Sequence, residues 1–268
     1  MKNQSMVPAL LRDLWDKKGW IIGFNLLAAL GALVVTLLMP KEYLAEASLL
    51  PANSRMMDKQ RLFGENIQEL YSAYGGSDDL DRLFATMESA SVLQHVTDSL
   101  NLIGYYKLSG KKNARIVARK NLEQQIKLIR SEYGELRLRV WDKDTTMSER
   151  IAGALIVRTQ QVFDDMFRLY YDRSIGNLQR ELDARNQLPA DSLAKVVNAT
   201  DKAFLQNRIA EYQVTRLNPP PAFIVMEQPM ASTIADRPRL LMNLLAAIFF
   251  ATFTSVAFFS ARIVWQKL

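Results

Sequence analysis

The stretch TLLMPKEYLAEASLLP, residues 36–51, changes its hydrophobic pattern within a few residues. It starts as the end of an apolar run and is interrupted by Pro40. Beyond the proline, the residues at alternate positions are Tyr43, Ala45, Ala47 and Leu49. This period of two is typical of a strand, and Pro51 ends it. Inside a bilayer only a helix or a closed barrel satisfies the backbone, whereas in water a strand can pair. We therefore place Pro40 at a membrane surface.

Two uncharged runs bracket the chain, at residues 20–39 and 240–261. Each holds about 20 residues, which as a helix spans roughly 30 Å, the thickness of the hydrocarbon layer. Two other interpretations are a buried helix of a soluble protein and, for the first run, a signal peptide cleaved near Ala45-Glu46-Ala47. The first run is longer than the roughly 7–15 apolar residues of a signal peptide. We predict two transmembrane helices.

Charge at the ends of the runs indicates their orientation. Lys17 and Lys18 precede the first run, and Arg262 and Lys267 follow the second. Basic residues favour the cytoplasmic side, so we expect both termini in the cytoplasm. Arg237 and Arg239 would then lie on the opposite side, against this trend. The resulting division is a cytoplasmic segment 1–19, a span 20–39, a periplasmic domain 40–238, a span 239–262 and a cytoplasmic tail 263–268.

The composition excludes several functions. The formal net charge of +6 lies mostly at the membrane flanks, which leaves no basic stripe for nucleic acid. The chain has no cysteine, so no disulfide supports the domain outside the cytoplasm. We expect membrane lipids and no nucleic acid among its partners.

Between the spans, the pattern predicts a mixture of strands and helices. The clearest strand is 135–142, ELRLRVWD, with Leu136, Leu138 and Val140 on one face. Residues 223–228, FIVMEQ, are apolar on both faces until Glu227 and predict a central strand. Helices are expected at 61–74, 79–100, 109–130, about 146–188 and 191–217. Two of the three predicted strands adjoin the spans. The fold class is therefore an α+β membrane protein with a small membrane-proximal sheet and a long projecting helix.

The long helix has its own signals. Thr146 and Glu149 have the spacing of a capping box, which predicts the start of the helix. The residues expected on its apolar face are Ile151, Leu155, Val162, Met166 and Leu169. A helix of about 40 residues spans roughly 60 Å, more than one globular domain needs, so we expect it to pack against neighbours.

No residues combine into a catalytic, cofactor-binding or metal site. The single histidine, His95, has only Asp98 nearby in the sequence and is interpreted as a helix-surface residue. Asp78, Asp79 and Asp81 lack the glycine and glutamate of a calcium loop, and are interpreted as a helix N-terminus. We expect no catalytic residues, no metal and no cofactor, and hence no enzyme.

Aromatic and small residues give weaker signals. Trp141 and the pairs Tyr105-Tyr106 and Tyr170-Tyr171 could stack on sugar rings, although packing is the commoner role of such residues. In the spans, small residues would allow the two helices to approach closely. These residues are Ala28, Ala32, Ala247 and Ala251.

Four segments together resemble the polysaccharide co-polymerases, the Wzz-like chain-length determinant family. They are VPALLRDLWDKKGW (7–20), MPKEYLAEASLLP (39–51) with its Tyr-x-Ala-x-Ala element, ELRLRVWDKDTTMSERIAGALI (135–156) and VMEQPMASTIADRPRLL (225–241). The resemblance implies a homo-oligomeric ring in the bacterial inner membrane. It also implies that the ring sets the length of a lipid-linked polysaccharide, such as the O-antigen of lipopolysaccharide. The implied partners are further copies of the chain, a Wzy-type polymerase and the nascent glycan.

Three functions from different classes remain at this stage. The first is the non-catalytic regulator just described. The second is a two-span sensor of a periplasmic ligand, or a scaffold of a polysaccharide export complex. The third is a tethered glycosidase or glycosyltransferase, which needs paired carboxylates in a cleft. The chain ends soon after the second span, so a fused kinase is not expected.

Overall fold

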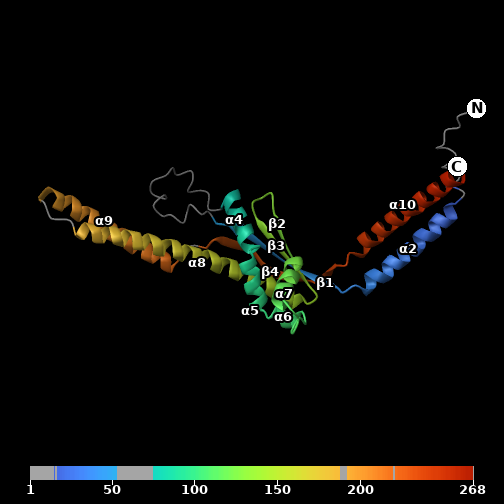
Figure 1. Ribbon diagram of the computed structural model, residues 1–268, viewed down its shortest axis with the longest axis horizontal. Coiled ribbons are helices and arrows are strands. Elements are labelled where there is room, and N and C mark those ends of the chain that lie inside the picture. Colours follow the sequence, from blue (N-terminus) through green and yellow to red (C-terminus); the bar gives the residue numbers. More distant parts are fainter. Residues whose placement is uncertain (1–14, 16, 53–74, 188–191, 220, 268) are drawn as a thin grey trace, which may run out of the picture. The chain divides into compact units, whose positions relative to one another are not determined.

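The structure, a computed structural model, describes residues 15, 17–52, 75–187, 192–219 and 221–267. The helix expected at 61–74 lies outside these residues. In chain order the elements are α2 (Lys18–Leu38), β1 (Glu42–Pro51), α4 (Ser77–Met87), α5 (Ala90–Ser99), α6 (Leu102–Tyr105), α7 (Ala114–Gln125), β2 (Ile126–Arg130), β3 (Leu136–Asp142), α8 (Thr145–Asn186), α9 (Ser192–Leu217), β4 (Phe223–Arg237) and α10 (Leu240–Lys267) (Figure 1).

The chain forms two compact units. The first contains Met1–Tyr43 and Ser232–Leu268, and the second contains Leu44–Ala231. In the first unit, α2 and α10 pack side by side (Figure 1). Both helices are long and apolar enough to cross a membrane, at Lys18–Leu38 and Leu240–Ala261. The two apolar helices predicted from the sequence are therefore present.

A four-stranded sheet has the order β2-β3-β1-β4. β2 and β3 are antiparallel, with Leu128 opposite Leu138. Side-chain hydrogen bonds join Ser48 to Glu135 and Glu46 to Arg139. The residue number falls along β1 while it rises along β3, so the two strands run antiparallel. The predicted strand at 135–142 is confirmed. The predicted pattern of β1 is also confirmed, because Ala45, Ala47 and Leu49 are fully buried.

The expected helix at 109–130 is wrong in its last part. Helix α7 ends at Gln125, and Ile126–Arg130 forms β2. The segment IKLIR carries branched residues that suit a strand, and β3 supplies the pairing partner. The turn between β2 and β3 contains Gly134 with φ of +81°, a backbone conformation that glycine adopts without strain. Tertiary pairing has therefore overridden a helical spacing.

The last strand also differs from the prediction. β4 lies at the edge of the sheet rather than in its centre, and it extends to Arg237, well beyond residue 228. Edge strands can accommodate a proline such as Pro229, because one side of the strand needs no ladder hydrogen bonds. The exposed side chains of Ile224 and Met226 agree with an edge position.

The long helix is present, with 42 residues in α8. Its N-cap is Asp144, whose carboxylate accepts a hydrogen bond from the Thr146 amide at 2.9 Å. The capping box predicted at Thr146 and Glu149 is therefore wrong by two residues. α9 returns beside α8 (Figure 1), and an ion pair of 2.6 Å joins Arg216 to Asp172.

The core of the second unit lies between one face of the sheet and α4, α5 and the first turns of α8. Ile151 and Leu155 of α8 are fully buried, as predicted. Met166 and Leu169 are 60% and 52% exposed, so the predicted apolar face does not stay buried along the helix. Met166 and Leu169 do follow the helical spacing of the apolar face, but no part of the described chain packs over them.

Candidate functional site: the paired apolar helices and the strands that adjoin them

Small side chains occupy the contact between α2 and α10. Thr36, Ala251 and Ser255 are buried, at 5%, 6% and 6% exposure, in helices that otherwise expose most of their side chains. Ala247 and Ala32 are half-buried one turn away. The small residues singled out in the sequence therefore do lie where the helices meet, and they allow the backbones to approach closely.

Two side-chain hydrogen bonds cross between the helices. The Thr252 hydroxyl donates to Asn25 Oδ1 at 2.8 Å, and the Asn243 amide donates to Thr36 Oγ1 at 3.3 Å. Such bonds satisfy polar groups that would otherwise face hydrocarbon. Sequence analysis missed them. The sequence did hold a sign of these bonds, because each uncharged run contains one asparagine, Asn25 in the first and Asn243 in the second.

The outward surface of these helices is apolar. Leu27 is 71% exposed on α2, and Phe249 and Phe253 are 67% and 66% exposed on α10. A water-soluble helix pair would turn such side chains inward, so an exposed apolar surface of this kind is suited to lipid. The first unit therefore has the character of a two-span membrane anchor.

Outside the apolar helices, ion pairs join β1 to β4 and β1 to β3. Arg237, near the end of β4, lies 3.4 Å from Glu42 at the start of β1. Arg139 makes two bonds to the Glu46 carboxylate, at 3.1 and 3.2 Å. These contacts fix the strands that adjoin both spans.

Glu135, directly before β3, is an acidic residue with two hydrogen-bond donors. It accepts hydrogen bonds from Arg137 at 2.6 Å and from Ser48 at 2.8 Å. The hydrogen bond from Arg137 is the main cause that lowers the pKa of the Glu135 carboxyl, and the bond from Ser48 adds to it. The group therefore stays charged and serves to connect β1 with β3.

The titratable residues considered in the sequence are dispersed. His95 is exposed on α5, as expected for a helix-surface residue. Asp78 and Asp79 lie in the first turn of α4, where Asp79 accepts a hydrogen bond from the Gly76 amide at 3.1 Å. Among the residues that the structure describes, no three His, Asp or Glu side chains come together as a metal site.

The hydroxyl groups of Tyr105 and Tyr106 are both bonded within the chain. The Tyr105 hydroxyl donates to Asp142 at 2.5 Å, and the Tyr106 hydroxyl donates to Gln125 at 2.6 Å. Burial, followed by the bond to Asp142, raises the pKa of Tyr105 well above its ordinary value. Trp141 is 5% exposed, so its ring presents no free face to a sugar, whereas Tyr105 is 36% exposed. Tyr170 is different, because it is 61% exposed beside a pocket.

Residues 7–100 match the model of the Wzz family, described as chain length determinant protein. The matched residues contain the first two segments on which the resemblance was based, and the two later segments lie beyond them. The match confirms the resemblance over residues 7–100, which are less than half of the chain. The match supports a role in chain-length regulation in general terms.

A solved structure described as a full-length bacterial polysaccharide co-polymerase is 12% identical, with a TM-score of 0.38, and the alignment covers 96% of this chain and 97% of that chain. A likeness at this identity and TM-score carries no weight for function. None of the curated proteins matches the chain.

Proposed function

We propose that this protein is a non-catalytic regulator of the length of a lipid-linked surface polysaccharide, such as O-antigen. It works as an oligomeric co-polymerase in the bacterial inner membrane and acts on the polymerase that extends the glycan. The observation that carries this proposal is the match of residues 7–100 to the chain length determinant family. That stretch contains the first apolar helix, β1 and the helices α4 and α5.

The proposed orientation places residues 40–238 in the periplasm and both termini in the cytoplasm. Lys17 and Lys18 next to the first span support this arrangement. Two spans place both ends of the chain on one side of the membrane. The domain that holds the sheet and the long helices then faces the compartment in which lipid-linked glycans are extended.

Self-association is part of the proposal. Several large apolar side chains of α8 and α9 are exposed to water in the single chain, among them Val157 (57%), Leu169 (52%) and Phe204 (61%). Exposed apolar residues on adjacent helices favour contact with another protein surface. Further copies of the same chain would cover them in a ring.

The test is deletion of the gene in its source bacterium, followed by gel analysis of the surface glycans. We expect the normal cluster of chain lengths to be replaced by a broad distribution, because the polymerase would lack its regulator. The full chain supplied from a plasmid should restore the cluster. A deletion strain with an unchanged length distribution would contradict the proposed function.

A further inference from the structure

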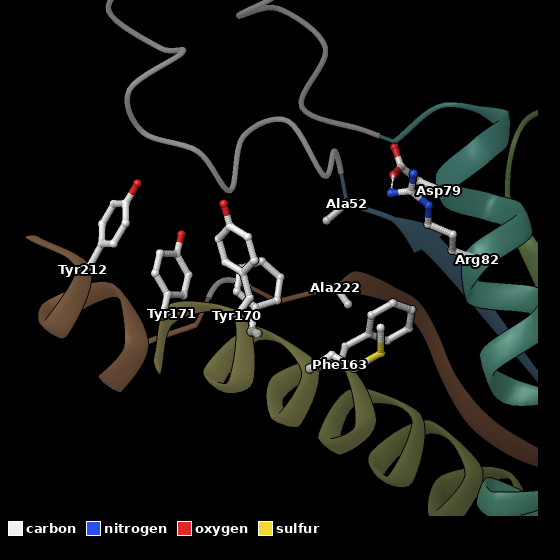
Figure 2. A pocket seen from close by; sticks show the side chains of 10 residues that line it. Ala52, Asp79, Arg82, Phe163, Tyr170, Tyr171, Tyr212 and Ala222 are labelled. Atoms are coloured by element: carbon white, nitrogen blue, oxygen red, sulfur yellow. Dashed lines mark ion pairs between the residues drawn. The ribbon is translucent and has the colours of Figure 1, made fainter. Parts of the chain in front are cut away.

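A pocket of about 420 Å³ opens between α4, α8 and α9, within the second unit. This volume falls in the lower part of the range of roughly 300–1,000 Å³ that is usual for small-ligand sites. The residues that line it are Ala52, Asp79, Arg82, Phe163, Met166, Phe167, Tyr170, Tyr171, Tyr212 and Ala222 (Figure 2).

The wall formed by α8 and α9 is aromatic and firmly held. Tyr171 is 5% exposed, and its ring packs edge-on against Tyr170 at 5.4 Å and against Tyr212 at 5.2 Å, measured between ring centroids. Tyr171 therefore serves as an anchor, and Tyr170, at 61% exposure, presents its ring to the opening. In Figure 2 the hydroxyl groups of the three tyrosines point to the same side of the helices.

Two contacts hold this wall in place. Arg216 of α9 forms an ion pair with Asp172 of α8 at 2.6 Å, and the Arg208 guanidinium lies 5.3 Å from the centre of the Tyr212 ring. The aromatic rings therefore stand on two helices that are tied to each other. A site on such rigid elements loses little entropy when a ligand binds.

The opposite wall, from α4, is charged. Asp79 is held by the Gly76 amide, and its side chain is 14% exposed. Arg82 lies 3.8 Å from the Asp79 carboxylate, and its side chain is 65% exposed (Figure 2). The pair thus offers an acceptor in a fixed position and a cation with several N–H donors facing solvent.

This combination has a definite chemical preference. A lipid chain would remove Asp79, Arg82 and the tyrosine hydroxyls from water without replacing their hydrogen bonds. A phosphate would meet the Asp79 carboxylate. A pyranose ring fits both walls, because one of its faces carries C–H groups that can lie on an aromatic ring while its hydroxyls both donate and accept.

We propose that the pocket binds a short pyranose segment of a polysaccharide, with a sugar ring stacked on Tyr170 and hydroxyls bonded to Asp79 and Arg82. The inference rests on the proposed function, and it identifies the part of this chain that contacts the growing glycan. It places that contact at the base of the α8–α9 hairpin, outside the apolar helices.

The test uses the full chain in lipid nanodiscs. The probe is an oligosaccharide of one to three repeat units, released from the surface polysaccharide of the source bacterium. Saturation-transfer NMR identifies the bound sugar protons, and a titration gives the Kd. We expect saturable binding that Tyr170→Ala weakens about tenfold, as the loss of an aromatic stack implies. Tyr170→Phe, which keeps the ring, should retain most of the affinity.

The matched control is Tyr133→Ala. Tyr133 is 88% exposed in the turn between β2 and β3 and is not among the residues that line the pocket, so its removal should leave the Kd unchanged. Arg82→Gln provides a second variant at an exposed position and should weaken binding several-fold. Absence of saturable binding to the wild type, or an equal Kd for wild type and Tyr170→Ala, would overturn the inference. Equal losses for Tyr133→Ala and Tyr170→Ala would also overturn it.

The outcome separates this inference from the proposed function. If the deletion strain loses its normal chain lengths but the wild type binds no oligosaccharide, the pocket is not a glycan site and the regulatory role stands. If the deletion strain keeps its normal chain lengths, the regulatory role falls, whatever the pocket binds.

Discussion

The two units of the molecule bury opposite kinds of side chain. Where α2 meets α10, the buried residues are Thr36, Ala251 and Ser255, and large apolar residues lie outside. In the second unit, residues such as Leu138 and Leu155 are fully buried, and the outer face of β3 carries Arg137 and Arg139. The difference follows from the solvent, because lipid gives apolar side chains no reason to turn inward, whereas water does.

Different interactions hold each of the two units together. The water-facing domain depends on the burial of large apolar side chains, so it should be sensitive to cavities. The span pair depends on close backbone approach and on a few polar bonds, so it should be sensitive to added volume. We therefore test the domain with a substitution that removes volume from its core, and the span pair with one that adds volume between the helices.

The largest effect is expected in the core of the domain. Leu155→Ala should lower the free energy of unfolding by about 2–5 kcal/mol, because it leaves a cavity at a fully buried position. The control is Ile116→Ala on α7, where the side chain is 49% exposed. Urea unfolding followed by Trp141 fluorescence, with the other three tryptophans replaced by phenylalanine, measures both. Equal losses for the two variants would contradict the assigned core.

A smaller effect is expected in the span pair. Ala251→Leu should destabilise the contact between α2 and α10 by about 1–3 kcal/mol, because the added atoms have no room at a buried position. Ala246→Leu, at an exposed position of the same helix, is the control.

The absence of native cysteines makes this contact measurable. Thr36→Cys and Asn243→Cys, introduced together, should cross-link on oxidation, because the two native side chains are joined by a hydrogen bond. The cross-linked fraction should fall with Ala251→Leu and stay constant with Ala246→Leu. The reverse order would show that the two helices meet through a different face.

At the start of α8, we expect a loss of about 1 kcal/mol in the free energy of unfolding when the N-cap is removed. Asp144→Ala removes the carboxylate that bonds to the Thr146 amide, and a lost N-cap typically costs about 0.5–2 kcal/mol. Thr146→Ala should cost less, although the sequence favoured Thr146 as the cap. Thermal unfolding of the two variants decides between the two positions. A larger loss for Thr146→Ala would place the cap where the sequence predicted it.

The smallest expected effect depends on pH. Because Arg137 and Ser48 lower the folded-state pKa of Glu135 below its ordinary value of 4.5, the charged group stabilises the folded protein above about pH 4.5. This contribution is lost as the pH falls from 4.5 through the lowered pKa. Glu135→Gln should therefore flatten the pH dependence of stability in that interval, and Glu132→Gln at an exposed neighbouring position should not. Parallel curves for wild type and Glu135→Gln would refute the assignment.

Much of the architecture can be predicted from local patterns in the sequence. The two apolar runs, the alternation of Leu136, Leu138 and Val140, and the length of α8 each depend on a strong period or composition. Such signals are read directly from the sequence, because neighbouring residues alone determine them. The family resemblance rests on four such local segments, at 7–20, 39–51, 135–156 and 225–241.

The features that the sequence did not predict depend on distant residues. Ile126–Arg130 suits a helix or a strand, and pairing with β3 decides between them. The edge position of β4 follows from sheet order, which no local pattern contains. The pocket joins Asp79 and Arg82 of α4 to Tyr170 of α8, residues that are far apart in the chain. The sequence singled out Tyr170 as an aromatic residue that could stack on a sugar, and Asp79 only as part of a helix N-terminus; it gave no sign that the two line one pocket.

The most direct test of the account is the mass of the full chain in a native-like bilayer, measured on nanodiscs by native mass spectrometry or light scattering. A regulator that works as a ring should give one defined mass that corresponds to several protomers. That mass should persist on dilution, because the exposed apolar residues of α8 and α9 would be covered by neighbouring copies. A single protomer in every nanodisc would contradict the account.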